Sequence, residues 1–338
     1  MIENSDRIAI LGAGSWGLAV ASLLARNGHD VCVWSYLQSE ADELITTRTS
    51  PKLPQINLVS EIDVTTDLKH ALSDSKCVVF ALPTQTVRNV AMKLGSFIQP
   101  EMILVSLSKG IEKSTLRRVS EVLIDEIPAA TENNVAVISG PSHAEEVALC
   151  KPTSVVVASS SERVGAWVQE VFSSGDFRVY RSDDVVGVEM GGAVKNIIAI
   201  AAGIAVALKL GDNALGALLT RGLAEMSRLG LKLGANPLTF AGLSGIGDLI
   251  TTCFSKHSRN RAVGEKIGLG KKLPEILESI GMVAEGVDTC VSVRDLARQK
   301  DVETPITDAV YSTLFENKDP RAAVRELMGR SLKEEMWS

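Results

Sequence analysis

Short apolar segments alternate with longer amphipathic ones through the first 160 residues of the chain. Six of these segments are rich in β-branched residues and bounded by Gly, Pro, Asn or Ser: residues 7–11, 31–34, 77–82, 102–107, 135–138 and 154–158. Strands that are buried on both faces have this composition, and their alternation with helices is typical of βαβ units. The pattern predicts an α/β domain with a doubly wound, mostly parallel sheet.

The second part of the chain has a helical pattern and no strand signal. Helices are predicted over residues 188–211, 213–229, 238–249, 260–267, 273–279, 289–299, 306–316 and 320–328, several of them with Gly just beyond the end. No flexible linker separates the two parts. We therefore expect a domain of residues 1–187 packed rigidly against an all-helical domain of residues 188–338, with a cleft between them.

Composition narrows the class of protein. The 338 residues suggest about two domains, and the balance of 45% hydrophobic to 22% charged residues excludes a disordered or collagenous chain. The formal net charge of -6 provides no attraction to nucleic acid or to an anionic membrane surface. We expect neither as a partner.

Cysteines and histidines give no sign of a disulfide framework or a metal site. The five cysteines are scattered without a CxxC pair, and none of the four histidines belongs to an HExxH motif. The N-terminus lacks the features of a signal peptide. The longest uncharged apolar run, residues 197–208, would span about 18 Å as a helix, less than a bilayer core of about 30 Å. We expect a soluble cytoplasmic protein without a membrane span.

Three glycines form a GxGxxG motif between the first predicted strand and the helix that follows it, namely Gly12, Gly14 and Gly17. In a Rossmann-like βαβ unit such glycines permit a tight turn, close approach of a pyrophosphate and close packing of helix on strand. The motif predicts dinucleotide binding; the alternative is a glycine-rich turn without a ligand.

The second strand is followed by Ser35 and Tyr36, without the acidic residue that NAD-specific folds use to hold the ribose 2′-hydroxyl. Its absence favours NADP(H) as the cofactor, with NAD(H) possible. The alternative is that Glu40 or Arg48 folds back and determines the preference.

Polar groups also follow two later strands, where doubly wound folds bind ligands. Lys109 in SLSKG is a candidate contact for substrate or cofactor, or else an ordinary solvated lysine. In SGPSHA, the amides of residues 140–142 and the Ser142 hydroxyl suit a phosphate or hydroxyl group, although the pattern alone slightly favours Ser142 as a helix N-cap. His143 is a candidate acid–base group or a structural histidine.

Lys195 lies within an otherwise apolar predicted helix and follows two glycines. Burial would lower its pKa toward neutrality and suit it to proton transfer with a secondary alcohol; the alternative is a lysine that extends to solvent. Asp248, between glycines and an apolar run, needs a partner such as a lysine or a substrate hydroxyl, or else caps a helix. An ionised Asp248 near Lys195 would oppose the effect of burial.

A short basic loop precedes the predicted helix at residue 260. Arg259 offers a guanidinium fork that suits a phosphate, and Asn260 with the helix N-terminus adds neutral donors. The alternatives are a solvated loop or nucleic-acid binding. Nucleic-acid binding is disfavoured because the run of basic residues is short and the protein as a whole is acidic.

Eight segments occur together in one order: GAGSWG, SLSKG, SGPSHAEEVA, VGVEMGGAVKNIIAIAAGI, GDNALGALLTRGLAEM, TFAGLSGIGDLITTC, SRNR and VAEGV. In these segments the chain resembles the bacterial NAD(P)-dependent glycerol-3-phosphate dehydrogenases over nearly its whole length. The resemblance implies a cytoplasmic homodimer that reduces dihydroxyacetone phosphate to sn-glycerol 3-phosphate for phospholipid synthesis.

The resemblance also implies residue roles, with Lys195 as the general acid/base. The residues implied for the substrate are Lys109, Gly140, Ser142, Lys195, Asp248, Ser258, Arg259 and Asn260. Those implied for the cofactor, beside the three glycines, are Ser15, Trp16, Tyr36, Lys109, Ala144, Arg259, Val283 and Glu285. Two other functions stay open: a 3-hydroxyacid or ketopantoate-type reductase, and a nucleotide-sensing protein without turnover.

Overall fold

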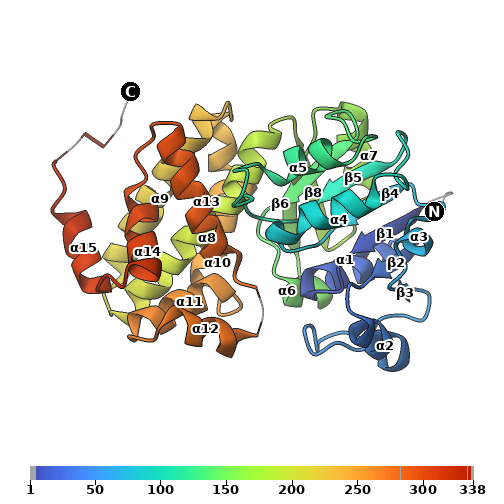
Figure 1. Ribbon diagram of the computed structural model, residues 1–338, viewed down its shortest axis with the longest axis horizontal. Helices are drawn as coiled ribbons and strands as arrows, with labels where there is room; N and C mark the ends of the chain where they lie inside the picture. The colour runs from blue at the N-terminus through green and yellow to red at the C-terminus, as the bar shows by residue number, and fades with distance from the viewer. Residues whose placement is uncertain (1–4, 282, 333, 336–338) are drawn as a thin grey trace.

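The computed structural model describes residues 5–281, 283–332 and 334–335. Figure 1 shows a sheet flanked by helices on one side of the molecule and a helical half on the other. The chain runs through the sheet half first and enters the helical half through one long helix, α8 (Val185–Ala207).

An eight-stranded sheet forms the first half, in the order β3-β2-β1-β4-β5-β6-β7-β8. All neighbouring strands are parallel except β6 and β7. This arrangement confirms the predicted doubly wound, mostly parallel sheet. The strands are β1 (Arg7–Leu11), β2 (Asp30–Trp34), β3 (Asp63–Thr65), β4 (Cys77–Phe80), β5 (Ile103–Ser106), β6 (Val135–Ser139), β7 (Thr153–Ala158) and β8 (Phe177–Ser182).

Two strands, β3 and β8, were not predicted, and both lie at edges of the sheet. β3 has only three residues, two of them partly exposed. β8 alternates buried with exposed positions and carries two arginines. An edge strand that is solvated on one face lacks the continuous apolar run by which the central strands were recognised.

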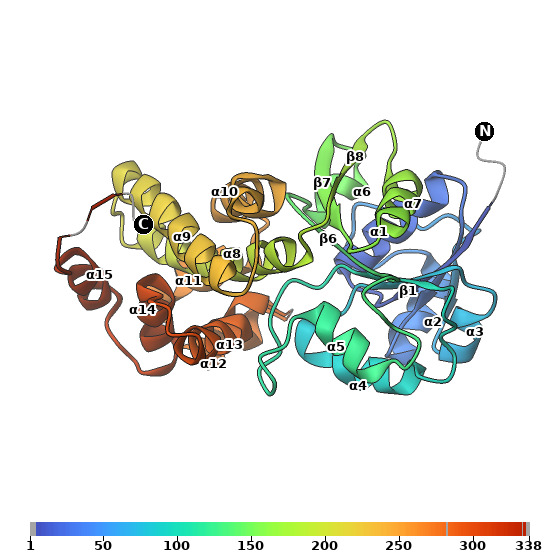
Figure 2. The same ribbon diagram turned by 90° about the horizontal axis from the view of Figure 1, so that it is seen from above.

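Alternate residues along the strands enter two separate cores. Ile8 and Ile10 of β1 join a cluster with α1 (Ser15–Arg26), α6 (Ala144–Ala148) and α7 (Glu162–Phe172). Ala9 and Leu11 join a second cluster with α3 (Leu68–Leu72), α4 (Val87–Leu94) and α5 (Val119–Glu126). Figure 2 shows these two helical layers on opposite sides of the sheet. Helix α2 (Gln38–Thr47) extends the first layer through Ala41 and Leu44.

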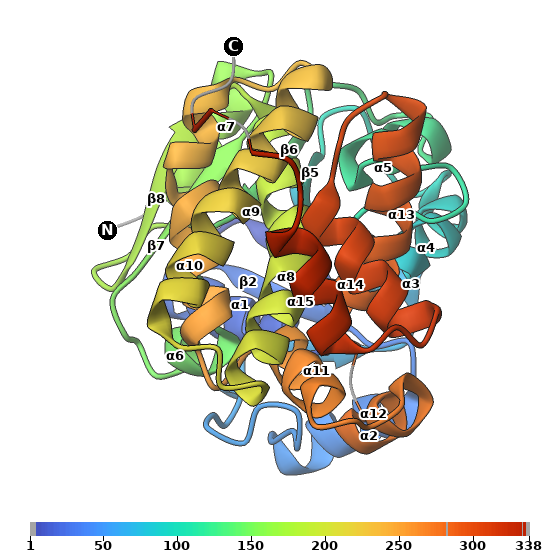
Figure 3. The ribbon, with the colours of Figure 1, turned by 90° about the vertical axis from the view of Figure 1, so that its left-hand side faces the viewer.

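Helix α8 is the axis of the second half. Figure 3 shows it among α9 (Asp212–Lys232), α10 (Asp248–Phe254), α11 (Arg259–Gly268), α13 (Glu285–Gln299), α14 (Pro305–Phe315) and α15 (Pro320–Met328), with α12 (Leu273–Ile280) at the lower edge. Within the described ranges, α8 is the one helix long and apolar enough to cross a bilayer, and 83% of its most apolar 18-residue window is buried inside the protein. Burial of that kind is typical of a core helix.

One predicted helix, residues 238–249, is wrong in form. The segment instead contains a 3₁₀ helix (Pro237–Ala241), a π turn (Leu243–Gly247) and the start of α10. A Cβ atom on Gly245 would lie 2.0 Å from the carbonyl oxygen of Phe240, so the backbone folds back on itself too closely for a regular helix. We keep a domain boundary near residue 187 as a proposal: β8 ends at Ser182 and α8 begins at Val185.

Candidate active site

A cleft of about 510 Å³ lies between the two halves. Its walls come from the glycine turn before α1, the loops after β4, β5 and β6, the middle of α8, and the starts of α11 and α13. Most of these segments end or begin at the carboxyl edge of the sheet, which is where doubly wound folds bind ligands.

The glycine turn has one open face. Gly12 has a φ of +121°, and a Cβ atom there would lie 2.5 Å from the carbonyl oxygen of Ala81; a Cβ on Gly17 would lie 2.0 Å from that of Gly12. Gly14, by contrast, has no atom within 4 Å of its Cβ position and lines the cleft. Two glycines thus allow tight packing, while the third leaves room for a pyrophosphate at the N-terminus of α1.

Two side chains next to Gly14 extend this wall. Trp16 lines the cleft, and its indole Nε1 is buried without a hydrogen-bond partner in the described part of the chain. Ser15 donates from Oγ to the carbonyl oxygen of Lys52 at 2.9 Å, which holds the 48–62 loop against the turn. An indole N–H without a protein acceptor and an open face at Gly14 both fit a bound dinucleotide.

Lys195 is buried in the cleft wall, with a 5% exposed surface. Its Nζ donates to Asp248 Oδ1 at 2.7 Å and to Thr252 Oγ1 at 2.6 Å. Burial lowers the pKa of Lys195 to about 8, although the negative charge of Asp248 opposes that effect. The interpretation of a lysine extending to solvent is therefore wrong, and of the two opposed effects burial is the larger.

Asp248 lies behind the cleft surface, between two ammonium groups. Its Oδ2 accepts from Lys109 Nζ at 2.8 Å while Oδ1 accepts from Lys195. Burial favours the protonated acid, but the two lysines outweigh it and hold the pKa of Asp248 below its ordinary value. The cluster carries two positive charges against one negative charge, and Asp248 begins α10 without capping it, since the N-cap residue is Gly247.

Glycines let these groups meet. A Cβ on Gly191 would lie 2.4 Å from the carbonyl oxygen of Ser244, so α8 packs directly on the turn that leads to Asp248. A Cβ on Gly192 would lie 3.5 Å from Lys109 Cγ, so the same helix also lies against the Lys109 stem. The pair of glycines before Lys195 is therefore a packing feature that brings α8, Lys109 and Asp248 together.

Lys109 also holds the loop after β6. Its Nζ donates to the carbonyl oxygen of Gly140 at 2.9 Å and to Ser142 Oγ at 3.4 Å. The Ser142 hydroxyl donates to the same Gly140 oxygen at 2.9 Å. The N-cap of α6 is His143, so the interpretation of Ser142 as the cap is wrong. Ala144, the first residue of α6, lines the cleft.

His143 faces a second histidine at the cleft. The rings of His143 and His257 lie 5.9 Å apart, one from the loop after β6 and the other from the loop before α11. Burial lowers the pKa of His143, and the charge of Lys195 acts in the same direction. His143 is therefore a neutral group at physiological pH.

The loop before α11 supplies Ser258, Arg259 and Asn260. Ser258 caps the helix by accepting from the Arg261 amide at 3.2 Å. Asn260 is buried, donates to Asn196 Oδ1 at 2.9 Å and accepts from the Gly286 amide at 2.9 Å. The Arg259 guanidinium lines the cleft and donates to the carbonyl oxygen of Val283 at 3.1 Å.

Glu285 begins α13 at the cleft and links the two halves. Its Oε1 accepts from the Thr84 amide, which follows β4, at 2.9 Å. Burial raises the pKa of Glu285 to about 7.

The remaining wall surrounds the end of β2. Tyr36 is 69% exposed there. Glu40 accepts from Ser35 Oγ at 3.3 Å and pairs with Lys52 Nζ, and Glu40 and Lys52 both line the cleft. The Arg48 side chain is bonded to carbonyl oxygens of its own loop, including that of Ile62 at 2.8 Å. Of the two residues proposed to fold back, Glu40 does so.

Comparison with known proteins identifies the family. The model of the NAD-dependent glycerol-3-phosphate dehydrogenase N-terminus matches residues 7–165, and that of the C-terminus of the same enzyme matches residues 184–325. The chain belongs to the NAD-dependent glycerol-3-phosphate dehydrogenase family. A glycerol-3-phosphate dehydrogenase [NAD(P)+] of Enterococcus faecalis is 48% identical over 331 residues, 98% of this chain and 97% of that protein.

Solved structures support membership of the glycerol-3-phosphate dehydrogenase family. The crystal structure of the Coxiella burnetii glycerol-3-phosphate dehydrogenase matches with a TM-score of 0.92 at 39% identity, covering 96% of this chain and 99% of that one. A PanE/ApbA family ketopantoate reductase from Ralstonia eutropha matches with a TM-score of 0.60 at 14% identity, covering 95% and 99%. At that identity the second match shows a shared fold alone.

Most residues that the family resemblance implied for ligand binding lie on the cleft. Gly17, Gly140 and Asp248 are not part of its lining: Gly17 packs α1 on the turn, and the other two act on the cleft through Lys109. The prediction missed Thr252 and Lys52. Thr252 lies one helical turn after Asp248, a spacing that could have identified it, whereas nothing in the sequence around Lys52 marks it.

Proposed function

We propose that the protein reduces dihydroxyacetone phosphate to sn-glycerol 3-phosphate with NADPH or NADH, reversibly, and so supplies glycerophospholipid synthesis. The observation that carries the proposal is the buried Lys195 ammonium, held by Asp248 in a cleft whose opposite wall is the open glycine turn. Family membership and the named activity of the relatives support it.

Lys195 would donate the proton in this reaction. A nicotinamide dinucleotide held by Gly14, Ser15 and Trp16 would supply a hydride to C2 of the ketone. Lys195, with a pKa of about 8, is mostly charged at pH 7 and can donate a hydrogen bond and then a proton to the substrate oxygen. Asp248 fixes the position of the ammonium and keeps it charged despite its burial. Such stabilisation of developing charge contributes about 3–4 kcal/mol to a barrier.

The substrate phosphate would bind at the start of α11. Arg259 offers a guanidinium at the cleft surface, and the Arg259 and Asn260 amides at the start of the helix would face an anion bound there. The positive excess of the Lys109, Lys195 and Asp248 cluster adds a favourable potential for a dianionic substrate. Asn260 would act by holding α8, α11 and α13 together, since both ends of its amide already have partners.

For the cofactor we propose a preference for NADP(H), with NAD(H) accepted. No acid follows β2 directly, and Lys52, which lines the cleft with Tyr36 and Glu40, offers an ammonium that could pair with a 2′-phosphate. Glu40, the present partner of Lys52, offers the carboxylate that a ribose 2′-hydroxyl prefers. Lys52 would leave Glu40 to pair with the 2′-phosphate of NADP(H), and Glu40 would leave Lys52 to bind the 2′-hydroxyl of NAD(H). One site would accept both cofactors in this way.

The test is an assay of nicotinamide absorbance with three candidate substrates. We expect turnover with dihydroxyacetone phosphate, much less with dihydroxyacetone, and none with ketopantoate. Ketopantoate as the preferred substrate would support the rival reductase, and binding of NADPH without turnover of any ketone would support a sensing protein. Comparison of NADPH with NADH in the same assay tests the cofactor preference.

We also propose a cytoplasmic homodimer. Leu231, Ile250 and Phe254 of α9 and α10 are large apolar side chains that are about half exposed, a feature typical of protein interfaces. Light scattering should give twice the 36.1 kDa mass of one chain.

A further inference from the structure

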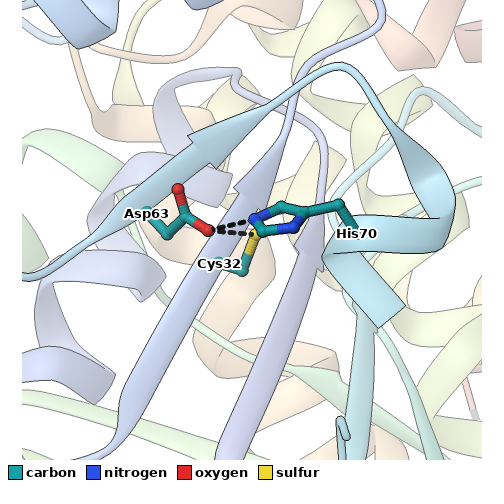
Figure 4. A group of neighbouring side chains, drawn as sticks. All are labelled: Cys32, Asp63 and His70. Carbon is teal, nitrogen blue, oxygen red and sulfur yellow. Dashed lines mark hydrogen bonds and ion pairs between the residues drawn. The ribbon is translucent and has the colours of Figure 1, made fainter. Parts of the chain in front are cut away.

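A cysteine, an aspartate and a histidine meet at the β2–β3 edge of the sheet, away from the cleft lining (Figure 4). Cys32 of β2 and Asp63 of β3 are direct partners in the strand register. His70 comes from α3 on the face of the sheet to which Cys32 points. Three separate elements therefore direct one sulfur, one oxygen and one nitrogen atom to a common point.

The spacing of these atoms is close to that of a metal's ligands. All three lie within 4.8 Å of one another, with Asp63 Oδ2 3.6 Å from Cys32 Sγ and 2.6 Å from His70 Nε2. Zinc bonds of 2.0–2.3 Å in tetrahedral geometry place neighbouring ligand atoms about 3.3–3.8 Å apart. The Cys32–Asp63 distance already meets this requirement, and the histidine must shift by about an ångström.

The three ligands differ in burial. Cys32 is fully buried in its strand, whereas the Asp63 side chain is 40% exposed and only its backbone is fixed beside Cys32 by the sheet. The His70 side chain is 52% exposed, so it can move the required distance, and water can reach the fourth coordination position from its side. A buried thiol with a carboxylate and an imidazole that are both partly exposed is an arrangement that can close around an ion.

Charge balance also suits a divalent ion. A thiolate and a carboxylate would supply two negative charges, and the neutral imidazole none. Arg7 lies beside the carboxylate, with Nη2 3.7 Å from Asp63 Oδ2, but its Nη1 pairs with Asp30 at 2.9 Å. Asp30 therefore balances the charge of Arg7. The sulfur and nitrogen donors favour zinc over Mg²⁺ or Ca²⁺, which prefer sites made only of oxygen ligands.

We propose that Cys32, Asp63 and His70 form a binding site for a zinc-type divalent ion, with water as the fourth ligand. The ion would join β2, β3 and α3, none of which provides a proton-transfer residue, and would stabilise the edge of the sheet near the end of β2. The site is independent of the proposed reaction.

Cobalt titration of the purified full-length protein tests the site, because Co²⁺ replaces zinc and gives a near-ultraviolet absorption band only when a thiolate is bound. We expect one Co²⁺ per chain with that band, displacement by Zn²⁺, and a higher melting temperature with either ion. Cys32→Ser should abolish the band, and His70→Gln should weaken Co²⁺ binding at least about tenfold. Both variants should retain the turnover of the parent protein.

Cys150→Ser is the matched control, because Cys150 is the exposed cysteine among the five and the thiol most open to adventitious cobalt. This variant should keep the band. The proposal is overturned if no thiolate band forms, if the band survives in Cys32→Ser, or if Cys150→Ser removes it. His70→Gln changes an exposed side chain and so stays informative if Cys32→Ser fails to fold; unchanged cobalt affinity in His70→Gln also overturns the site.

Discussion

Replacing Asp248 with Asn should move the pH dependence of ketone reduction. The substitution removes the negative charge 2.7 Å from Lys195 Nζ while keeping the shape of the side chain. Opposite charges about 4 Å apart attract by about 4 kcal/mol at an effective dielectric constant of about 20. Loss of that attraction lowers the pKa of Lys195, which is about 8 in the parent protein, by about three pH units.

The rate follows the fraction of Lys195 that carries its proton. A lysine with a pKa of about 8 is about nine-tenths protonated at pH 7, whereas one with a pKa of about 5 is about one-hundredth protonated. The kcat/KM for dihydroxyacetone phosphate should therefore fall about 100-fold at pH 7. In the parent protein, kcat/KM for reduction should decline as the pH rises through about 8, and in Asp248→Asn the decline should begin at far lower pH.

Initial rates of nicotinamide oxidation between pH 5 and pH 10 would measure both profiles. Glu189→Gln is the control, because it breaks another buried ion pair of α8, with Arg118 at 2.7 Å, without touching Lys195. That variant should lose stability but keep the decline near pH 8. An Asp248→Asn protein with parental rates and a decline that stays near pH 8 would refute the role given to this ion pair.

Five further substitutions follow from the cleft. Arg259→Met should raise the KM for dihydroxyacetone phosphate about 10- to 100-fold with little change in kcat, since a charge-assisted hydrogen bond contributes about 1.5–3 kcal/mol; an unchanged KM contradicts its phosphate contact. Lys52→Met should weaken the binding of NADPH more than that of NADH, and Glu40→Gln should weaken the binding of NADH more than that of NADPH. Dissociation constants measured by fluorescence test both, and equal losses of affinity for the two cofactors argue against the proposed roles of Lys52 and Glu40. Gly14→Val should abolish cofactor binding with an unchanged melting temperature, because the valine side chain would enter the open face of the turn. Gly17→Ala should instead lower the melting temperature, because the added Cβ would clash with the carbonyl oxygen of Gly12. Cofactor binding by Gly14→Val would contradict the pyrophosphate assignment.

The central strands could be predicted because burial on both faces requires a nearly continuous apolar sequence, as in β1, β4 and β5. The edge strands β3 and β8 are partly exposed, so their sequences need not be continuously apolar and were not recognised. The helical half was recognised from its capping residues and period, but residues 238–249 were not resolved into a 3₁₀ helix and a π turn. Contacts made by glycines with distant backbone, as at Gly245, determine that geometry.

The site was predicted only as separate motifs. Sequence patterns gave equal weight to a buried Lys195 and to one that extends to solvent, and left Asp248 either paired or capping a helix. They could not decide because the two residues lie 53 positions apart and their contact depends on the packing of α10 on α8. The balance between burial and ion pairing at Lys195 likewise required coordinates. The cluster of Cys32, Asp63 and His70 gave no signal, because its spacing matches none of the short metal-binding motifs.

Turnover by Lys195→Ala tests the account most directly, since the proposed chemistry depends on the proton of that ammonium. With NADPH and dihydroxyacetone phosphate both saturating, we expect kcat to fall by about 100- to 1000-fold, corresponding to about 3–4 kcal/mol, while the dissociation constant of NADPH changes little. Turnover within a few-fold of the parent protein would contradict the account.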